Sequence, residues 1–175
     1  KSMRLNYLKV LKRPKVLVIC TGDELINEKK KTSLVVSTNN IFIRYFVELF
    51  GGEIVNIQFS KDNQTDFKKK FKSTKNFDLL ITSGGISRGK YDIVKESLKG
   101  FGLKILFDRV AIKPGKPTTF GKFGKNKFFL GLPGNPVSCF MSLINFLPIY
   151  INSYYGKKMV NLKFVEFSSK SFIER

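Results

Sequence analysis

Histidine is absent from this 175-residue chain, and cysteine occurs only twice, at Cys20 and Cys139. Without histidine, the chain offers no imidazole for general-base catalysis or for metal binding. Two widely separated cysteines are too few for a zinc site made of thiolates. Such sparse use of cysteine favours a reducing intracellular setting, and we expect a cytoplasmic protein.

Long apolar runs are also missing. The longest ones, such as residues 16–20 and 140–147, are much shorter than the roughly 20 residues that a membrane-spanning helix needs, so we expect no membrane association. Residues 1–13 lack the apolar stretch and cleavage site of a signal peptide. Because the chain does not begin with Met, we interpret it as a piece of a longer protein, and a removed leader stays open.

Acidic residues are few: 13 stand against 32 lysines and arginines, for a formal net charge of +19. Such a charge favours anionic partners, either nucleic acid or phosphorylated small molecules, although a merely solvated lysine-rich surface explains it equally well. The lysine runs at 29–31 and 68–70 lack the aromatic platforms and arginine forks that read bases. Nucleic-acid binding is therefore the minor hypothesis, and we expect no nucleic-acid partner.

Apolar and polar segments alternate with the spacing of an α/β domain. The patterns predict strands at 15–21, 53–59, 77–82, 103–112 and 118–132, the last a hairpin, and helices at 39–50, 63–72, 92–100 and 136–155. Strands that alternate with helices indicate a three-layer α/β/α domain with a largely parallel mixed sheet. We expect residues 1–14 to be the tail of a preceding domain or a linker, 15–156 to be the α/β domain, and 157–175 to start a C-terminal β domain.

Two helices carry more specific expectations. In the first, Asn39 or Asn40 is expected to cap a helix in which Phe42, Phe46, Leu49 and Phe50 share one face. In the last, Pro148 is expected to kink or split the helix. That helix also carries more aromatic side chains than one face can bury, so some should pack on a neighbouring domain or subunit; burial against its own sheet is the alternative. These aromatic residues are Phe140, Phe146, Tyr150, Tyr154 and Tyr155.

Four polar segments follow predicted strands or precede the last helix: Thr21–Glu24, Ser83–Asp92, Lys113–Pro117 and Gly131–Pro136. In open α/β sheets, ligands bind beyond the carboxyl ends of the strands. We therefore expect these segments to form one site.

Each segment has a chemical interpretation and a plainer alternative. Gly84, Gly85 and Gly89 allow backbone N–H groups to face a phosphate beside the Ser83 and Ser87 hydroxyls, but a glycine pair is also an ordinary tight turn. Lys113 and Lys116 are cations on a proline-stiffened loop that suits phosphates or an oxyanion, but a solvated lysine pair has the same sequence. Gly134, between two prolines at the start of a helix, forms either a rigid anion-facing turn or a connector.

Glu24, Asp62 and Asp92 are carboxylates at predicted strand or helix ends. Together they are suited to hold Mg²⁺, which binds to a few carboxylates plus substrate phosphates. Individually, each is better interpreted as a helix cap or a surface acid.

Together, these segments resemble the MoeA/gephyrin-type molybdopterin molybdotransferases, specifically their molybdopterin-binding domain. The resemblance covers about residues 13–156 and keeps the family's order and spacing in the stretches 21–25, 82–92, 109–117 and 131–138. MogA-type adenylylating proteins share the fold, but they typically carry a Thr-Gly-Gly-Thr-Gly loop and lack Lys-Pro-Gly-Lys-Pro. The chain is therefore more similar to MoeA, with a MogA-like fold.

The resemblance implies a late step of molybdenum-cofactor synthesis. Members of the MoeA/gephyrin-type family cleave the phosphoanhydride of adenylylated molybdopterin in a Mg²⁺-dependent way, release AMP and leave molybdate on the dithiolene. It also implies a homodimer for the full-length protein and a MogA-type adenylyltransferase as a partner. A non-catalytic pterin-binding or scaffold module, and a MogA-like molybdopterin adenylyltransferase, are the alternatives. Because family members use a cleft shared between domains and subunits, we expect this chain alone to turn over poorly and to be monomeric or weakly dimeric.

Carried over by position, the resemblance implies catalytic roles for Glu24, Asp62, Asp92, Lys113 and Lys116, with the three acids as metal ligands. Asn63 stands where the family usually has a second acid, and Ser37–Thr38–Asn39 stands where it often has Asp-Ser-Asn. The implied substrate-binding positions are Thr21, Gly22, Asp23, Asn39, Ser83, Gly84, Gly85, Ser87, Gly89, Arg109, Pro114, Gly115, Pro133, Gly134, Asn135 and Pro136.

Overall fold

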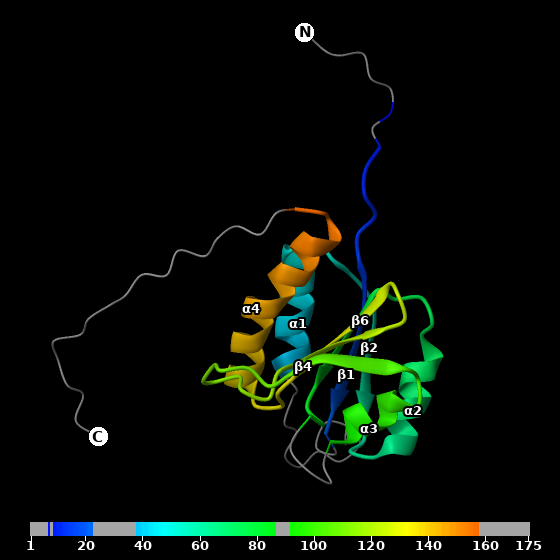
Figure 1. Ribbon diagram of the computed structural model, residues 1–175, viewed down its shortest axis with the longest axis vertical. Helices are drawn as coiled ribbons and strands as arrows, with labels where there is room; N and C mark the ends of the chain where they lie inside the picture. Colours follow the sequence, from blue (N-terminus) through cyan, green and yellow to red (C-terminus); the bar gives the residue numbers. More distant parts are fainter. Residues whose placement is uncertain (1–6, 8, 23–37, 87–91, 158–175) are drawn as a thin grey trace, which may run out of the picture.

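The structure, a computed structural model, describes residues 7, 9–22, 38–86 and 92–157. This part of the chain forms six strands and four helices, which alternate as far as β4 (Figure 1). Their order is β1 (Lys15–Thr21), α1 (Thr38–Leu49), β2 (Glu53–Ser60), α2 (Gln64–Ser73), β3 (Leu79–Ser83), α3 (Ile93–Lys99), β4 (Leu103–Asp108), β5 (Thr119–Phe123), β6 (Lys127–Leu132) and α4 (Pro136–Tyr154).

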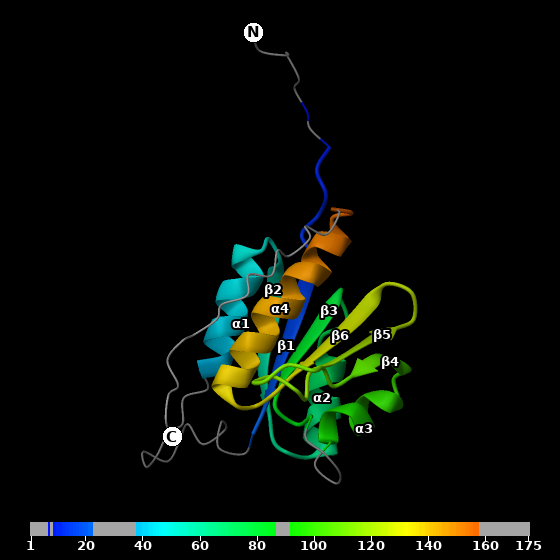
Figure 2. The ribbon, with the colours of Figure 1, turned by 60° about the vertical axis from the view of Figure 1, so that its left-hand side comes forward.

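All six strands form one sheet in the order β2-β1-β3-β6-β5-β4. Strand β5 pairs antiparallel with both of its neighbours, and the other pairings are parallel. Helices α1 and α4 cover one face, and α2 and α3 cover the other (Figures 1 and 2). The predicted three-layer domain with a largely parallel mixed sheet is confirmed.

Strand β1 shows why the sheet centre is apolar on both faces. Val16, Val18 and Cys20 pack into the core under α1 and α4, whereas Leu17 and Ile19 pack into the core over α2 and α3. A central parallel strand is buried on both sides, so its sequence is a continuous apolar run rather than an alternation. Each such side chain contributes about 1.5–3 kcal/mol by its burial.

The expected shared apolar face of the first helix is confirmed for Phe42, Phe46 and Phe50, which are partly buried against the core, but not for Leu49. The helix begins at Thr38, and its buried residues are Asn39, Ile43 and Val47, while Leu49 is exposed. Phe46 lies beside Phe140 of α4, with ring centroids 5.6 Å apart. Because α1 leans against α4 as well as the sheet, its phenylalanines face the neighbouring helix, and smaller residues face the strands.

Strand β4 is shorter than the predicted 103–112. It ends at Asp108, because Arg109 adopts a left-handed backbone conformation with φ of +74° that no strand continues. Helix α4 is not split: it runs through Pro148, with Leu147 and Ile151 buried on either side of the proline. Packing of both turns against the sheet offsets the one lost backbone hydrogen bond.

Helix α4 is relevant to the expectation that no segment of the chain spans a membrane. Within the described ranges, it is the one helix that is long and apolar enough to cross a bilayer by length and composition. Core helices of soluble domains meet the same test. Cys139, Leu143, Leu147 and Ile151 of α4 are buried in the core of this domain, while Val137, Ile149 and Tyr154 of the same helix are exposed.

Candidate functional site

Three of the four polar segments meet where β1, β3 and β6 end. In the sheet register, Cys20 lies beside Ser83, and Ser83 lies beside Leu132. The chain continues from each strand into a loop at this edge, and the Gly84 N–H donates to the Leu132 carbonyl at 3.0 Å. The parallel pairing therefore confirms the expected juxtaposition of Thr21, the Ser83–Gly85 turn and the Pro133–Pro136 turn.

Asn39 connects helix α1 to two of these loops. Its side-chain amide donates to Ser83 Oγ at 2.7 Å and to the Gly134 carbonyl at 2.8 Å. Asn39 is 7% exposed and lies inside the helix, so the expectation that it caps the helix is wrong. Asn39 Oδ1 and Thr21 Oγ1 are buried and make no hydrogen bond to a described residue. Buried polar atoms usually have partners, so these two are available to a ligand or a neighbouring loop.

The Gly84–Gly85 turn needs glycine for two separate reasons. Both residues have positive φ, +88° and +63°. A Cβ on Gly84 would lie 2.6 Å from the Thr21 carbonyl oxygen, and a Cβ on Gly85 would lie 2.7 Å from Val94 Cγ2. The turn therefore packs tightly on the β1 loop and on α3, and its backbone is preformed.

The Gly134 turn leads directly into α4. Pro133 is buried, Gly134 is exposed, and a Cβ on Gly134 would lie 3.5 Å from Gly84 Cα. Asn135 caps the helix by accepting the Ser138 N–H at 3.1 Å, and Pro136 is the first helical residue. The side-chain oxygen of Asn135 is therefore occupied by this helix cap. The positive end of the 19-residue helix lies next to the turn.

The lysine loop, residues 109–118, is anchored from beneath. Thr118 Oγ1 lies 2.7 Å from the Gly115 carbonyl oxygen and 2.6 Å from Ser142 Oγ of α4, and all three residues are buried. Lys113 and Lys116 are exposed, and neither forms an ion pair within the described ranges. A rigid loop that presents two solvated ammonium groups is suited to bind an anion.

Of the three candidate metal ligands, the structure describes Asp62 and Asp92. Asp92 caps α3 by accepting the Lys95 N–H, and its carboxylate lies 2.6 Å from Lys95 Nζ. Asp62 is exposed, two residues after β2. Glu24 lies outside the described residues, as do Asp23, Ser87 and Gly89. Among described residues, no three acidic or cysteine side chains are placed to hold a metal ion, so the magnesium site stays a prediction.

Two charged residues beside the candidate site were not expected: Lys95 and Asp108. Lys95 Nζ donates to Asp108 Oδ2 at 2.8 Å, and Thr119 Oγ1 donates to Asp108 Oδ1 at 2.6 Å. Burial alone would raise the pKa of Asp108, but hydrogen bonds from Lys95 and Thr119 and the charges of Lys95 and Arg109 outweigh it and lower that pKa. The sequence signals were the three-residue spacing of Asp92 and Lys95 and the acid just before Arg109.

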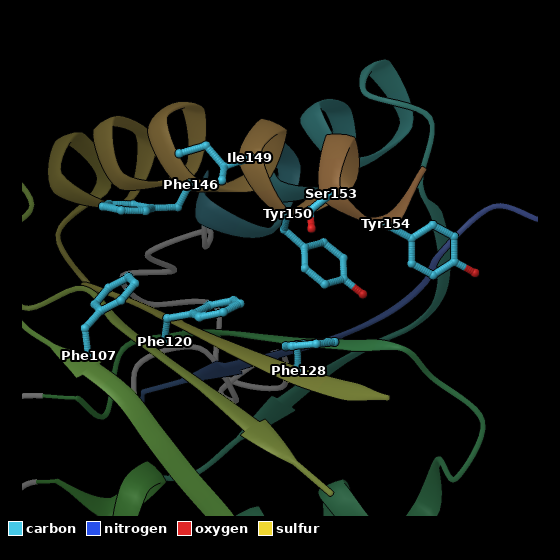
Figure 3. Close-up of a pocket in the computed structure, with 8 residues that line it drawn as sticks. All are labelled: Phe107, Phe120, Phe128, Phe146, Ile149, Tyr150, Ser153 and Tyr154. Atoms are coloured by element: carbon cyan, nitrogen blue, oxygen red, sulfur yellow. The ribbon is translucent and has the colours of Figure 1, made fainter. Parts of the chain in front are cut away.

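A groove lies away from this edge, along α4. Phe107, Phe120 and Phe128 of the sheet face Phe146 and Tyr150 of the helix across a space of about 320 Å³ (Figure 3). Of the other α4 aromatic residues, Phe140 packs on Phe42 and Phe46, Tyr154 also lines the groove, and the Tyr155 hydroxyl donates to the Gly51 carbonyl at 2.8 Å. The aromatic side chains of this helix thus contact their own domain, and packing on a second domain or subunit stays a prediction for those in the groove.

A second cavity, of about 480 Å³, lies among Phe71, Phe77, Phe101 and Phe123. Lys127 Nζ lies 4.6 Å from the Phe77 ring centroid, and Lys72 Nζ lies 5.6 Å from the Phe101 ring centroid. Lysine stems commonly cover apolar surface while their ammonium groups remain in water. These lysines therefore match the interpretation of the positive charge as a solvated surface.

Sequence comparisons find relatives for almost the whole chain. Residues 17–152 match the model of a family described as "Probable molybdopterin binding domain". A molybdopterin molybdenumtransferase of Haemophilus influenzae is 36% identical over 160 residues, which are 90% of this chain and 39% of that protein. One from Nostoc is 34% identical over 154 residues, 85% of this chain and 35% of that protein. The chain thus spans less than two fifths of the length of these relatives.

Solved structures share the fold. MoaB from Thermus thermophilus superposes with a TM-score of 0.61 at 18% identity, over 82% of this chain and 98% of that chain. A MoeA protein from Pyrococcus horikoshii superposes with a TM-score of 0.57 at 25% identity, over 83% of this chain and 34% of that chain. The likeness to MoaB bears on the fold alone, and it confirms the expected MogA-like architecture.

Proposed function

We propose a function for this chain from one premise: it belongs to the family of probable molybdopterin-binding domains. Its relatives named molybdopterin molybdenumtransferase are transferases by name. We infer that the chain binds molybdopterin at the carboxyl edge of its sheet and supplies this domain to a molybdenum-inserting transferase. The observation that carries the proposal is the meeting of the Ser83–Gly85 and Pro133–Pro136 turns through Asn39.

The proposed reaction is cleavage of the phosphoanhydride of adenylylated molybdopterin, with release of AMP and transfer of molybdate to the pterin dithiolene. Lys113 and Lys116 bind molybdate or the pterin phosphate as charge-assisted donors. The Gly84 N–H already donates to the Leu132 carbonyl, so the following N–H groups of the preformed glycine turn, together with the positive end of α4, stabilise negative charge on the substrate. These groups orient the anhydride and need no rearrangement to do so.

Carboxylate oxygens are ligands that suit Mg²⁺, and Glu24, Asp62 and Asp92 would hold the ion together with substrate phosphates. When bound, Mg²⁺ neutralises phosphate charge. Asp92 is already paired with Lys95, so its carboxylate is fixed in place before any ligand binds.

A non-catalytic pterin-binding module is the second candidate. The match covers 39% and 35% of the two relatives named molybdopterin molybdenumtransferase, so the rest of those proteins lies outside it. A MogA-like adenylyltransferase is the third. An AMP-release assay with adenylylated molybdopterin separates the first two, because a binding module retains affinity without turnover. An adenylyltransferase instead consumes ATP and unmodified molybdopterin.

Calorimetry with molybdopterin, and separately with duplex DNA, tests the proposed ligand class. We expect saturable molybdopterin binding and only weak, salt-sensitive DNA binding from the +19 charge. Tight DNA binding without molybdopterin binding would contradict the proposal.

We further propose that the full-length protein is a cytoplasmic homodimer that receives its substrate from a MogA-type adenylyltransferase. The groove along α4 supports an additional contact in the longer protein, because exposed aromatic surface commonly marks interfaces. Sedimentation at moderate salt tests the assembly: the 175-residue chain should be monomeric or weakly dimeric, and the full-length protein a dimer. A tight dimer of the short chain would show that this domain carries the main interface itself.

A further inference from the structure

The Lys95 ammonium lies between two carboxylates from two different site segments. Its Nζ is 2.6 Å from Asp92 Oδ2 and 2.8 Å from Asp108 Oδ2. Asp92 ends the segment that contains the Gly84–Gly85 turn, and Asp108 directly precedes the lysine loop. A single cation therefore connects the acid-bearing segment of the candidate site to its anion-binding loop.

This contact differs from an ordinary surface ion pair on the same helix. Side-chain exposure is 17% for Lys95, 14% for Asp92 and 43% for Asp108, so the Asp92 end of the contact is shielded and the Asp108 end is half-exposed. Lys99 and Glu96, one turn along α3, have the same spacing and the same 2.6 Å distance, but their exposures are 69% and 52%. Exposed pairs of that kind are worth little, whereas a shielded pair with two partners restrains its groups more strongly. The exposed Lys99–Glu96 pair therefore provides an internal control for experiments on Lys95.

On the far side of the bridge, Asp108 is tied into the base of the lysine loop. Thr119 Oγ1 donates to its other carboxylate oxygen at 2.6 Å. The next residue, Arg109, holds a left-handed backbone conformation and donates its N–H to the Thr118 carbonyl at 2.9 Å. A non-glycine residue persists in that conformation only where its surroundings hold it, so the loop begins from a constrained point.

We propose that Lys95 is a positioning residue, which holds Asp92 and the lysine loop at a fixed separation so that both act on one phosphate-bearing ligand. The inference rests on the proposed function, because it assigns to that ligand the groups that Lys95 aligns. The alternative is that Lys95 only stabilises the first turn of α3. The two roles predict different results when Lys95 is replaced: a positioning residue affects the lysine loop as well, whereas a residue that stabilises only α3 affects that helix alone.

Amide hydrogen exchange of the ligand-free chain tests the positioning role without reference to any activity. Lys95→Met removes the charge and keeps most of the aliphatic stem. We expect the exchange rates of the Val110 and Thr118 amides, which bond to Lys116 and Gly115 within the loop, to rise about 10-fold. Lys99→Met should leave them unchanged, and Lys95→Arg should restore them to within about 2-fold of the wild-type rates.

Loop amides that keep their wild-type rates in Lys95→Met, with faster exchange confined to α3, would overturn the proposal. Should Lys95→Met prove too unstable, Asp108→Asn removes the negative charge from the far end of the same bridge without altering α3, and the same loop amides should exchange faster. Unchanged loop exchange in Asp108→Asn would equally overturn it.

Molybdopterin titration then separates this inference from the proposed function. Lys95→Met and Asp108→Asn should each weaken binding about 10-fold, and the double variant should be no weaker than either, because one broken bridge cannot be broken again. Unchanged affinity beside a loosened loop overturns the positioning role in binding. Absence of binding by the wild-type chain overturns the proposed function instead, while the exchange result still decides whether Lys95 holds the loop.

Discussion

Asn39 and Gly134, which are 95 positions apart, are joined by a 2.8 Å hydrogen bond from the asparagine amide to the glycine carbonyl. The same amide reaches Ser83 Oγ at 2.7 Å, so one buried side chain fixes α1, the β3 turn and the β6 turn. Both hydrogens of the amide are used. The geometry of this sheet edge therefore depends on Asn39 before any ligand is present.

Asn39→Ala should destabilise the domain by about 1–3 kcal/mol, because the buried Ser83 hydroxyl and the partly buried Gly134 carbonyl lose their donor. Urea unfolding measures the change. Asn56→Ala is the matched control: Asn56 is exposed, and its amide makes a 3.3 Å contact with Thr74, so its loss should cost less than about 0.5 kcal/mol. Equal effects of the two substitutions would contradict the role assigned to Asn39.

Gly84→Ala should be more damaging than Gly124→Ala. Both glycines have positive φ, +88° and +57°, so alanine strains the backbone at either position, by about 1 kcal/mol. Only at Gly84 would the new Cβ also meet backbone, 2.6 Å from the Thr21 carbonyl oxygen, while nothing lies within 4 Å at Gly124. Thermal unfolding should show an extra loss of about 1–3 kcal/mol at Gly84. Indistinguishable midpoints would argue against the close approach.

Lys113→Ala and Lys116→Ala should each weaken molybdopterin or molybdate binding by about 1.5–3 kcal/mol, roughly tenfold or more, and should reduce its salt dependence. Calorimetry at two salt concentrations measures both effects. Lys125→Ala removes an exposed lysine from the β5–β6 turn and serves as the control for net charge. If all three variants bind alike, the two loop lysines belong to the solvated surface.

Asp92→Asn should abolish most AMP release by the full-length protein while leaving the fold intact. The asparagine can still accept the Lys95 N–H as helix cap, so the substitution removes charge rather than the cap. Glu96→Gln, an exposed acid on the same helix, should have wild-type activity. Undiminished AMP release by Asp92→Asn would contradict the catalytic assignment, and circular dichroism checks that the fold is retained.

Cys139 should resist alkylation in the folded protein. Burial raises the pKa of its thiol from 9.0 to about 11, although a hydrogen bond with Ser83 opposes the shift. At pH 8.5, iodoacetamide should therefore label the Cys139 peptide about 100-fold more slowly than after unfolding in urea, as mass spectrometry of that peptide would show. Since the raised pKa favours the neutral thiol in the fold, this group's contribution to stability is present below pH 9 and is lost as the pH rises toward 11. Rapid labelling of the native protein would show that the thiol is accessible.

The sequence alone determined several helices and strands of this domain, because residues next to one another in the chain favour them directly. Val16–Cys20 predicts a buried central strand because no solvent-facing residue interrupts it. Asn63 was expected to begin α2, and its side chain accepts the Asp66 N–H at 2.9 Å. Helix α1 ends at Leu49, just before Gly51, whose φ of +91° favours glycine. Each of these signals acts within a few residues, and no distant contact overrides it.

The meeting of Thr21, Ser83–Gly85 and Pro133–Pro136 also followed from the sequence, because parallel strands end at one sheet edge. What the tertiary structure decided was how those segments are held. The buried face of α1 depends on the position of α4, the end of β4 depends on the hydrogen bonds of Arg109, and the Lys95 bridge depends on α3 lying beside β4. Side-chain periodicity reports which residues of one element share a face, but it contains no information on the neighbour that the face will meet. Asn39, Lys95 and Asp108 acquire their partners only when elements far apart in the chain pack together.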